Sequence, residues 1–273
     1  MVRSISERRA AFRKLHDSGC FVLPNPWDAG SARMFQHLGF QALASTSTGY
    51  AWTTGRPDYV LTLSDVLNHL KILCAAVDLP VNADFESGFA RDPEELAVNI
   101  HKAIETGVAG LSVEDRELDG SKRLFDTRLS VERIRAARQA IDHSGQDVVL
   151  VGRTEWLLED PTAVAPAIDK LVALAEAGAD CLYAPGVREK ADIAAMVRAV
   201  APKPVNVVMS RPGFSLAELM DLGVRRVSLG GAVARVAWAA VIKTMEQIKA
   251  GSFDGLAGGT PGGQMDEVFG RFC

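Results

Sequence analysis

Short apolar runs alternate along the chain with longer segments whose apolar positions recur at the spacing of an α-helix. The short runs have the length and the flanking turn residues of buried strands. These runs are Cys20–Leu23, Ala42–Ser45, Val81–Asp84, Gly110–Glu114, Val148–Arg153, Cys181–Ala184, Val205–Met209 and Arg226–Leu229. The helical segments include Asp65–Ala76, Pro93–Glu105, Ser130–Ile141 and Pro161–Ala177.

The regular order of a strand followed by a helix predicts parallel βαβ units. Eight such units in a chain of 273 residues match the count and size of a (β/α)₈ TIM barrel. Gly107 and Gly178 stand just before two strands, where glycine commonly ends a helix. No linker rich in proline or serine divides the chain. We therefore predict one barrel domain over residues 1–250, followed by a glycine-rich segment, 251–273, that is either a tail or a surface for docking on another subunit.

Composition excludes several classes of function. The chain is 48% apolar and 23% charged with a net charge of −4, and it has no long basic run, so nucleic acid is not an expected partner. Its four cysteines show no C-x-x-C spacing, which fits a reducing cytoplasm. The first segment is rich in arginine, contains Glu7 and lacks the apolar region of a signal peptide. No apolar run approaches the length of a membrane span, so no membrane association is expected.

Acidic residues collect where two neighbouring strands end. Asp84 and Glu86 are two residues apart and share a direction, and Glu114 and Asp115 follow the next strand. Carboxylates this close repel one another unless a proton or a cation neutralises them. An oxygen-rich cluster without thiolate or imidazole suits Mg²⁺ or Mn²⁺. The alternative is a strand-end acid that caps the next helix, and we favour it for Asp115 and for any one of these acids considered singly.

Other polar residues also end strands. Arg153 closes an apolar strand, where a guanidinium can bind a substrate carboxylate or phosphate, or instead form an ion pair with one of the acids. Asn206, near the end of the seventh strand, is a candidate donor to a substrate oxygen or a local turn residue. All five histidines fall in helical segments or at their ends. The sequence has no G-x-S-x-G motif, no P-loop and no G-x-G-x-x-G after a strand.

These residues together resemble the isocitrate lyase and phosphoenolpyruvate mutase superfamily of (β/α)₈ barrels. The segments that carry the resemblance are Pro24-Asn25-Pro26-Trp27-Asp28-Ala29, Ala44-Ser45-Thr46, Gly55-Arg56-Pro57-Asp58, Asn82-Ala83-Asp84-Phe85-Glu86-Ser87-Gly88, Ser112-Val113-Glu114-Asp115, Gly152-Arg153-Thr154 and Arg225-Arg226-Val227-Ser228. The resemblance implies that Asp84 binds the metal directly and that Asp58, Glu86 and Glu114 hold its waters. Glu86 replaces the aspartate that is commonest in this family.

The resemblance also implies substrate contacts. Ser45 and Thr46 match residues that hold the carboxylate and keto oxygen of the substrate, and Arg153 and Asn206 match further substrate-binding positions. The metal acts in this family as a Lewis acid that stabilises an enolate. The predicted catalytic residues are Arg153, Glu114, Lys122 and Arg123.

The branch within the superfamily depends on one loop. The lyases carry a cysteine in a loop K-[KR]-C-G-H, whereas Lys122-Arg123 is followed here by Leu124 and Phe125. The phosphonate enzymes carry Asn-Ser in a gating loop, which is also absent. We therefore predict a Mg²⁺-dependent enzyme, or a Mn²⁺-dependent one, that decarboxylates or cleaves a small 2-oxo dicarboxylate such as oxaloacetate. Residues 116–128 are predicted to form a lid.

Three alternatives remain. One is C–P bond chemistry on phosphonopyruvate or carboxyphosphonoenolpyruvate. Another is a sensor that binds a 2-oxo acid without catalysis, and the third is a phosphate site at Gly230-Gly231. The segment Ala232–Ile242 is apolar around most of its circumference. Because the resembling family exchanges its eighth helix between subunits, we predict a homodimer or homotetramer with that exchange.

Overall fold

The chain folds into a nearly closed barrel of eight parallel strands, and the computed structural model describes residues 3–272. Hydrogen-bonded neighbours follow the order β1-β8-β7-β6-β5-β4-β3-β2. At the open seam, the amide of Ala44 donates to the carbonyl of Pro24 at 3.0 Å. The strands are β1 (Phe21–Leu23), β2 (Leu43–Ala44), β3 (Val81–Asp84), β4 (Gly110–Val113), β5 (Val149–Arg153), β6 (Cys181–Tyr183), β7 (Val205–Val208) and β8 (Arg226–Ser228). The predicted (β/α)₈ barrel is confirmed, and every strand lies within one residue of its predicted range at either end.

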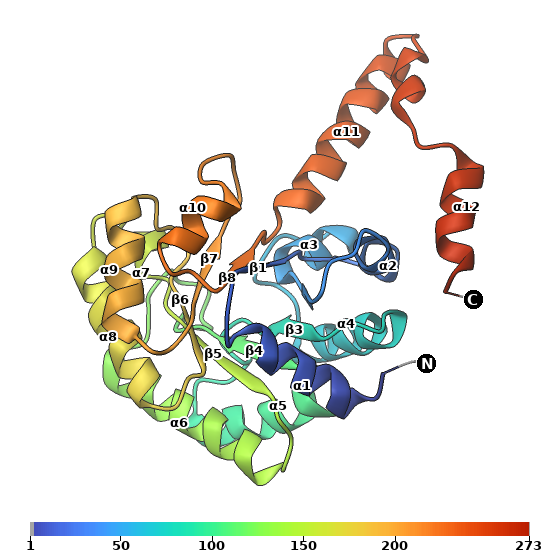
Figure 1. Cartoon of the computed structure of the whole chain (residues 1–273). Coiled ribbons are helices and arrows are strands. Elements are labelled where there is room, and N and C mark those ends of the chain that lie inside the picture. The colour runs from blue at the N-terminus through green and yellow to red at the C-terminus, as the bar shows by residue number, and fades with distance from the viewer. Residues whose placement is uncertain (1–2, 273) are drawn as a thin grey trace.

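Helices surround the barrel, as Figure 1 shows. They are α1 (Ile5–Leu15), α2 (Ala29–His37), α3 (Ser47–Thr53), α4 (Leu63–Ala76), α5 (Pro93–Glu105), α6 (Thr127–His143), α7 (Trp156–Glu159), α8 (Val164–Glu176), α9 (Lys190–Val200), α10 (Leu216–Asp221), α11 (Ala232–Lys249) and α12 (Gly262–Gly270), with a 3₁₀ turn η1 (Asp254–Gly258). The four helices named from the sequence correspond to α4, α5, α6 and α8. Helix α8 begins after Pro161 because Asp160 accepts from the Thr162 amide at 2.9 Å and holds a turn.

Glycine ends two of these helices as predicted. Gly107 after α5 and Gly178 after α8 have φ angles of 91° and 111°, in the left-handed region that glycine tolerates best. The chain then turns directly into β4 and β6. These caps determine where β4 and β6 begin. They therefore also determine which residues lie at the C-terminal ends of these strands.

Alternation along each strand separates an outer core from the barrel interior. On β3, Val81 and Ala83 pack among the helices, whereas Asn82 and Asp84 belong to the interior. The ring of Phe12 from α1 is fully buried and fills the interior where the strands begin. A Cβ added at Gly110 would lie 2.7 Å from that ring, so glycine is required there. Phe12 therefore packs the N-terminal end of the barrel, where the buried Arg226 guanidinium lies 5.9 Å from the centroid of its ring.

The last helices leave the barrel. Helix α11 projects away from it, and α12 returns toward α2 (Figure 1). Arg33 of α2 lies 5.5 Å above the ring centroid of Phe272. Helix α11 exposes Val236, Ile242 and Met245 by 70%, 54% and 55%. Exchange of a helix with another subunit is not shown. Within residues 3–272, no helix is long and apolar enough to cross a membrane.

His69 on α4 makes stability depend on pH. Its ring stacks on Tyr50 at 3.9 Å, and its Nε2 lies 3.0 Å from the carbonyl oxygen of Trp27. Burial lowers the pKa of His69 to about 4, below its ordinary value of 6.5. The unfolded chain therefore binds the proton first. This histidine contributes stability that is present above pH 6.5 and is lost as the pH falls toward 4.

We expect His69→Gln to reduce the loss of unfolding free energy between pH 7.5 and 5 by about 2 kcal/mol. Urea denaturation at both pH values measures this loss. The exposed His37 on α2 provides the matched control, and His37→Gln should leave the pH dependence as it is in the parent chain. An equal pH dependence in the His69 variant and the parent would contradict the assignment.

Candidate active site

Arg153, the last residue of β5, binds three acids at the C-terminal mouth of the barrel. Its Nη1 lies 3.0 Å from Asp84, its Nη2 lies 3.1 Å from Glu114, and its Nε lies 2.6 Å from Glu155. The guanidinium also lies 5.2 Å from the ring centroid of Tyr183. The predicted residues Asp84, Glu114 and Arg153 therefore meet, as expected for strand ends of one barrel. Of the two interpretations of Arg153, the ion pair with acidic residues is the one observed. Binding of a substrate carboxylate or phosphate by Arg153 stays a prediction.

The start of α3 holds Asp84 in place. Asp84 Oδ2 accepts from the amide of Ser47 at 3.0 Å and from its hydroxyl at 2.9 Å. The amide of Asp84 donates to Ser45 Oγ at 2.8 Å. Thr46 is the N-cap of α3, and its hydroxyl oxygen accepts from the amide of Gly49 at 3.1 Å. Of the predicted substrate-binding residues, Ser45 therefore contacts Asp84 directly, and Thr46 precedes Ser47 in the chain.

Two further acids, Asp58 and Glu86, interact electrostatically with Asp84. Thr48 donates to Asp58 at 2.7 Å. Burial raises the pKa of Asp58, and the negative charge of Asp84 adds to the rise. Burial raises the pKa of Glu86 to about 8, with further contributions from Asp84 and Asp58. Glu86 has a φ of 46°, a left-handed conformation that a residue with a side chain rarely adopts, so its placement costs backbone energy.

The donor set fits a hard cation. Glu86 Oε1 and Glu114 Oε1 are buried without a hydrogen-bond partner. Burial raises the pKa of Glu114 well above its ordinary range. Among residues 3–272, no three His, Cys, Asp or Glu side chains converge to hold a metal by themselves. A cation here would need water or substrate oxygens to complete its coordination shell. Mg²⁺ in proteins usually keeps several water ligands in this way.

Three residues of this site were not predicted from the sequence. Glu155 is fully buried, Ser47 holds Asp84, and Tyr183 lies against Arg153. A signal existed for Glu155, because it follows Arg153, the last residue of β5, by two residues. Ser47 continues a run of hydroxyl residues that begins at Ser45. Nothing in the sequence distinguishes Tyr183 from an ordinary apolar strand residue.

Asp115 has a structural role, but it does not cap the next helix. That expectation was wrong, because Asp126 caps α6. Asp115 lies 2.6 Å from the buried Lys170 ammonium and accepts from the hydroxyl of Thr154 at 2.7 Å. Lys170 also donates to the carbonyl of Phe125 at 2.5 Å, and the Phe125 amide donates to the Asp115 carbonyl at 2.7 Å. Asp115 and Lys170 thus hold together the two ends of the loop between β4 and α6.

The structure does not bring Lys122 and Arg123 into the cluster. Both are exposed in this loop, and Arg123 pairs with Asp119 at 2.5 Å. Leu124 forms an isolated antiparallel bridge with Arg116. Phe125, which stands where the lyases have glycine, is only 2% exposed. Catalytic roles for Lys122 and Arg123 therefore require the loop to move, and they stay predictions.

Asn206 lies inside the barrel rather than in a turn, so the turn interpretation is wrong. It is the second residue of β7 and is 1% exposed. Its amide donates to Ser228 Oγ at 3.0 Å, and its oxygen accepts from Arg226 Nε at 2.9 Å. Arg226 in turn lies 3.4 Å from Asn82 Oδ1 and 3.5 Å from His16 Nε2. Asn206 is thus already engaged within the barrel, and a substrate contact stays a prediction.

The proposed phosphate site at Gly230-Gly231 has a competing partner. Asn25 Oδ1 accepts from the amides of Leu229 and Gly230 at 2.8 and 2.9 Å. The side-chain amide of Asn25 donates to the Ser45 carbonyl at 2.8 Å. Asn25 therefore links the end of β8 to the end of β2, and the Gly230 amide is already occupied.

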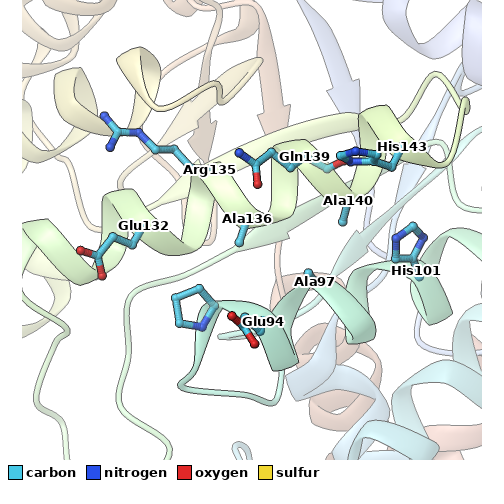
Figure 2. Close-up of a pocket in the computed structure, with 10 residues that line it drawn as sticks. Glu94, Ala97, His101, Glu132, Arg135, Ala136, Gln139, Ala140 and His143 are labelled. Carbon is cyan, nitrogen blue, oxygen red and sulfur yellow. The ribbon is translucent and has the colours of Figure 1, made fainter.

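A hollow of about 440 Å³ also lies outside the barrel, between α5 and α6 (Figure 2). Glu94 and His101 on α5 line it together with Glu132, Arg135 and His143 on α6. None of the predicted site residues lines this groove.

A parallel (β/α)₈ barrel with buried acids around one arginine at its C-terminal mouth has the architecture of an enzyme barrel. Residues 12–249 match the family model described as phosphoenolpyruvate phosphomutase. The chain belongs to this family, within the PEP mutase/isocitrate lyase superfamily. The resemblance inferred from the sequence is therefore confirmed, and the superfamily consists of enzymes that include lyases and mutases.

Individual relatives show how close the similarity is. The chain is 32% identical over 240 residues to an oxaloacetate decarboxylase of Pseudomonas paraeruginosa (strain DSM 24068 / PA7), covering 83% of this chain and 80% of the relative. A solved structure from Burkholderia cenocepacia J2315, assigned as a candidate lyase/mutase, is 41% identical with a TM-score of 0.94 and 97% coverage of both chains. The structure of oxaloacetate acetylhydrolase with the product oxalate is 28% identical with a TM-score of 0.86, covering 97% of this chain and 94% of the other.

Proposed function

We propose that the protein is a Mg²⁺-dependent enzyme, or a Mn²⁺-dependent one, that forms an enolate from a small 2-oxo dicarboxylate by decarboxylation or C–C cleavage. The observation that carries this proposal is the pair of buried, unpartnered carboxylate oxygens of Glu86 and Glu114 beside Asp84. Bound Mg²⁺ would supply Lewis acidity toward the 2-oxo group. Oxaloacetate is the first substrate to test, because a relative of 32% identity is an oxaloacetate decarboxylase.

The residues of the site have distinct proposed roles. Asp84 would bind the cation, with Asp58, Glu86 and Glu114 accepting from its waters. The hydroxyls of Ser45 and Thr46 would hold the substrate carboxylate and keto oxygen. The Ser45 hydroxyl contacts the Asp84 amide, and Thr46 is the N-cap of α3.

Arg153 would bind a carboxylate of the substrate, and Glu114 would transfer a proton. Arg153 has five N–H donors and can turn one of them from an acid to an incoming substrate carboxylate. Burial raises the pKa of Glu114, and its Oε1 is buried without a hydrogen-bond partner. Glu114 would therefore take a proton from a water that it holds and return it to the carbanion that would form when the bond breaks.

Phosphonopyruvate chemistry is the second candidate, because the family model is that of phosphoenolpyruvate phosphomutase. One screen separates the candidates. The protein is incubated with Mg²⁺ and panels of 2-oxo acids, 2-hydroxy acids and phosphonates, and pyruvate and inorganic phosphate are measured. We expect EDTA-sensitive pyruvate release from oxaloacetate. Phosphate release from phosphonopyruvate would favour the second candidate, and Mg²⁺-dependent oxalate binding without any turnover would indicate a sensor.

We propose that the loop between β4 and α6 closes over substrate. Gly120 and the exposed Lys122 and Arg123 form its tip, and few apolar contacts hold this tip. We expect limited trypsin cleavage after Lys122 or Arg123 to slow several-fold when Mg²⁺ and oxalate are added together. Cleavage at the exposed Arg198 serves as the internal reference. An unchanged ratio between the two cleavage rates would show that the loop does not respond to ligand.

We propose that α11 packs against a second copy of the chain. An apolar hollow of about 600 Å³ lies between Trp52 and Pro57 on one side and Trp238 and Ile242 on the other. Introducing a charge into this face should oppose association, so we expect Ile242→Glu to shift the protein from dimer or tetramer to monomer in light scattering. Lys243→Glu on the same helix is the control. A parent chain that is monomeric at micromolar concentration would refute the proposal.

A further inference from the structure

A second arginine, Arg116, lies next to the acids of the Arg153 cluster. It stands at the start of the loop between β4 and α6, where it forms the antiparallel bridge with Leu124. Its Nη2 donates to Glu159 Oε1 at 2.6 Å and lies 3.8 Å from Glu155 Oε2, which is too far for a hydrogen bond. Glu155 is also the acid that Arg153 Nε contacts at 2.6 Å. The two arginines therefore lie on either side of one carboxylate.

The contact between Arg116 and Glu155 is incomplete on both sides. Arg116 Nε and Glu155 Oε2 are buried, and neither has a hydrogen-bond partner among residues 3–272. A charged group that is buried with an unfilled hydrogen-bonding position costs free energy. A movement of the Arg116 guanidinium by about 1 Å would bring its Nη2 within the usual length of a charge-assisted hydrogen bond to Oε2. Arg116 thus lies close to a second position in which this contact is complete.

The exposure of the two acids decides which of them can lose its arginine. The Glu159 side chain is 27% exposed, so water can solvate it when Arg116 moves away. The Glu155 side chain is 0% exposed, and its backbone amide donates to Asp115 Oδ1 at 2.9 Å. Glu155 can therefore neither reach water nor follow a moving partner, and it needs a cation beside it whatever else binds at the site.

The ring of Tyr59 provides a surface along which Arg116 can move. The Arg116 guanidinium lies 5.0 Å from the centroid of this ring, and the face of an aromatic ring attracts a cation. Tyr59 has a φ of 61°, in the left-handed region, and it directly follows Asp58. A residue with a side chain adopts this conformation at a cost in backbone energy, and here the conformation places the ring beside Arg116.

A substrate carboxylate would bring a fourth anionic group to Arg153, which already contacts three acids. We propose that Arg116 replaces Arg153 as the ion-pair partner of Glu155 when substrate binds. Arg153 Nε is then free to donate to the substrate carboxylate, while Asp84 and Glu114 keep their contacts with Nη1 and Nη2. Arg116 is a positioning residue, because it acts on the substrate only through Arg153. This inference rests on the proposed function, since it requires Arg153 to bind a substrate carboxylate.

The test measures the affinity for oxalate in the presence of Mg²⁺ by calorimetry. Glu159→Gln removes the acid that competes for Arg116, so oxalate should bind about threefold more tightly. Arg116→Gln removes the group that replaces Arg153 at Glu155, so oxalate should bind about tenfold more weakly. Arg116→Lys keeps a cation at this position and should recover most of the affinity that Arg116→Gln loses.

The opposite signs of the two effects distinguish this role from a structural one. If Arg116 and Glu159 only held the loop in place, removing either of them should weaken oxalate binding. The matched control is Asp142→Asn on α6, which removes the more exposed of the two acids that contact Arg138, at 2.8 and 3.0 Å. This variant also breaks an ion pair between an arginine and an acid, and it should bind oxalate as the parent does.

Unchanged or weaker binding in Glu159→Gln, or unchanged binding in Arg116→Gln, would overturn the role assigned to Arg116. If Arg116→Gln does not fold, the sign of the effect of Glu159→Gln decides alone, because this acid is partly exposed and its neutral form keeps the shape of the side chain. Absence of Mg²⁺-dependent oxalate binding in the parent chain would instead overturn the proposed function, and with it this role of Arg116.

Discussion

Replacing Asp84 by asparagine is expected to lower Mg²⁺-dependent turnover of oxaloacetate by roughly 10³-fold or more. Asparagine keeps the shape of the side chain and can still accept from Ser47, but it removes the charge that would bind the cation. Arg153 retains Glu114 and Glu155 as ion-pair partners, so the fold should survive. Pyruvate release and urea denaturation, measured on the same preparation, separate loss of chemistry from loss of structure.

The control for this substitution is Asp169→Asn, an exposed aspartate on α8. It removes one carboxylate from the outer surface of the molecule and should leave turnover unchanged. Calorimetric titration of oxalate with Mg²⁺ gives a readout that does not depend on turnover. An affinity for oxalate that is the same in the Asp84 variant and the parent would show that Asp84 is not the metal ligand.

Replacing Arg153 by methionine is expected to destabilise the fold by about 3–5 kcal/mol, because breaking a buried ion pair leaves its partner charge uncompensated. Here three acids, Asp84, Glu114 and Glu155, would lose their common partner. Glu155 is fully buried, so it cannot turn to water without moving α7. Urea denaturation measures the loss.

The loss of unfolding free energy in this variant should also depend on pH, and the pKa of Glu114 decides in which direction. Burial already raises the pKa of Glu114 with Arg153 present, and removing the guanidinium raises it further. A folded-state pKa above the unfolded value costs stability as the pH rises, so the variant should be weaker at pH 8 than at pH 6. Arg198→Met is the control. A loss below about 1 kcal/mol at both pH values would mean that the three acids find other partners.

The strands and the centre of the site could be predicted because both follow from local pattern. A parallel barrel strand is a short apolar run, and barrel geometry places strand ends on one face, so Asp84, Glu114 and Arg153 had to converge once the eight runs were recognised. Glu155 could have been found by the same rule.

Other features depend on side-chain direction, which periodicity does not supply for residues near a strand end. Asn206 was assigned to an outlet or a turn, but the pleat of β7 directs it into the barrel beside Arg226. Asp115 was expected to cap a helix, whereas its partner, Lys170, is 55 positions further along the chain. Lys122 and Arg123 match a family motif, but their distance from the cluster depends on the conformation of a loop.

Lys170 binds both Asp115 and Phe125, which stand at the two ends of the loop between β4 and α6. The stability of the barrel should therefore depend little on the residues of the loop between them. Because the two ends of this loop are fixed to each other, residues added or removed near Gly120 lengthen or shorten only the free arc between them. Closing a longer arc costs little, since loop-closure free energy grows only logarithmically with length. The loop is therefore an exchangeable module, and grafting a relative's loop between these fixed ends would change what covers the substrate while the barrel keeps its melting temperature.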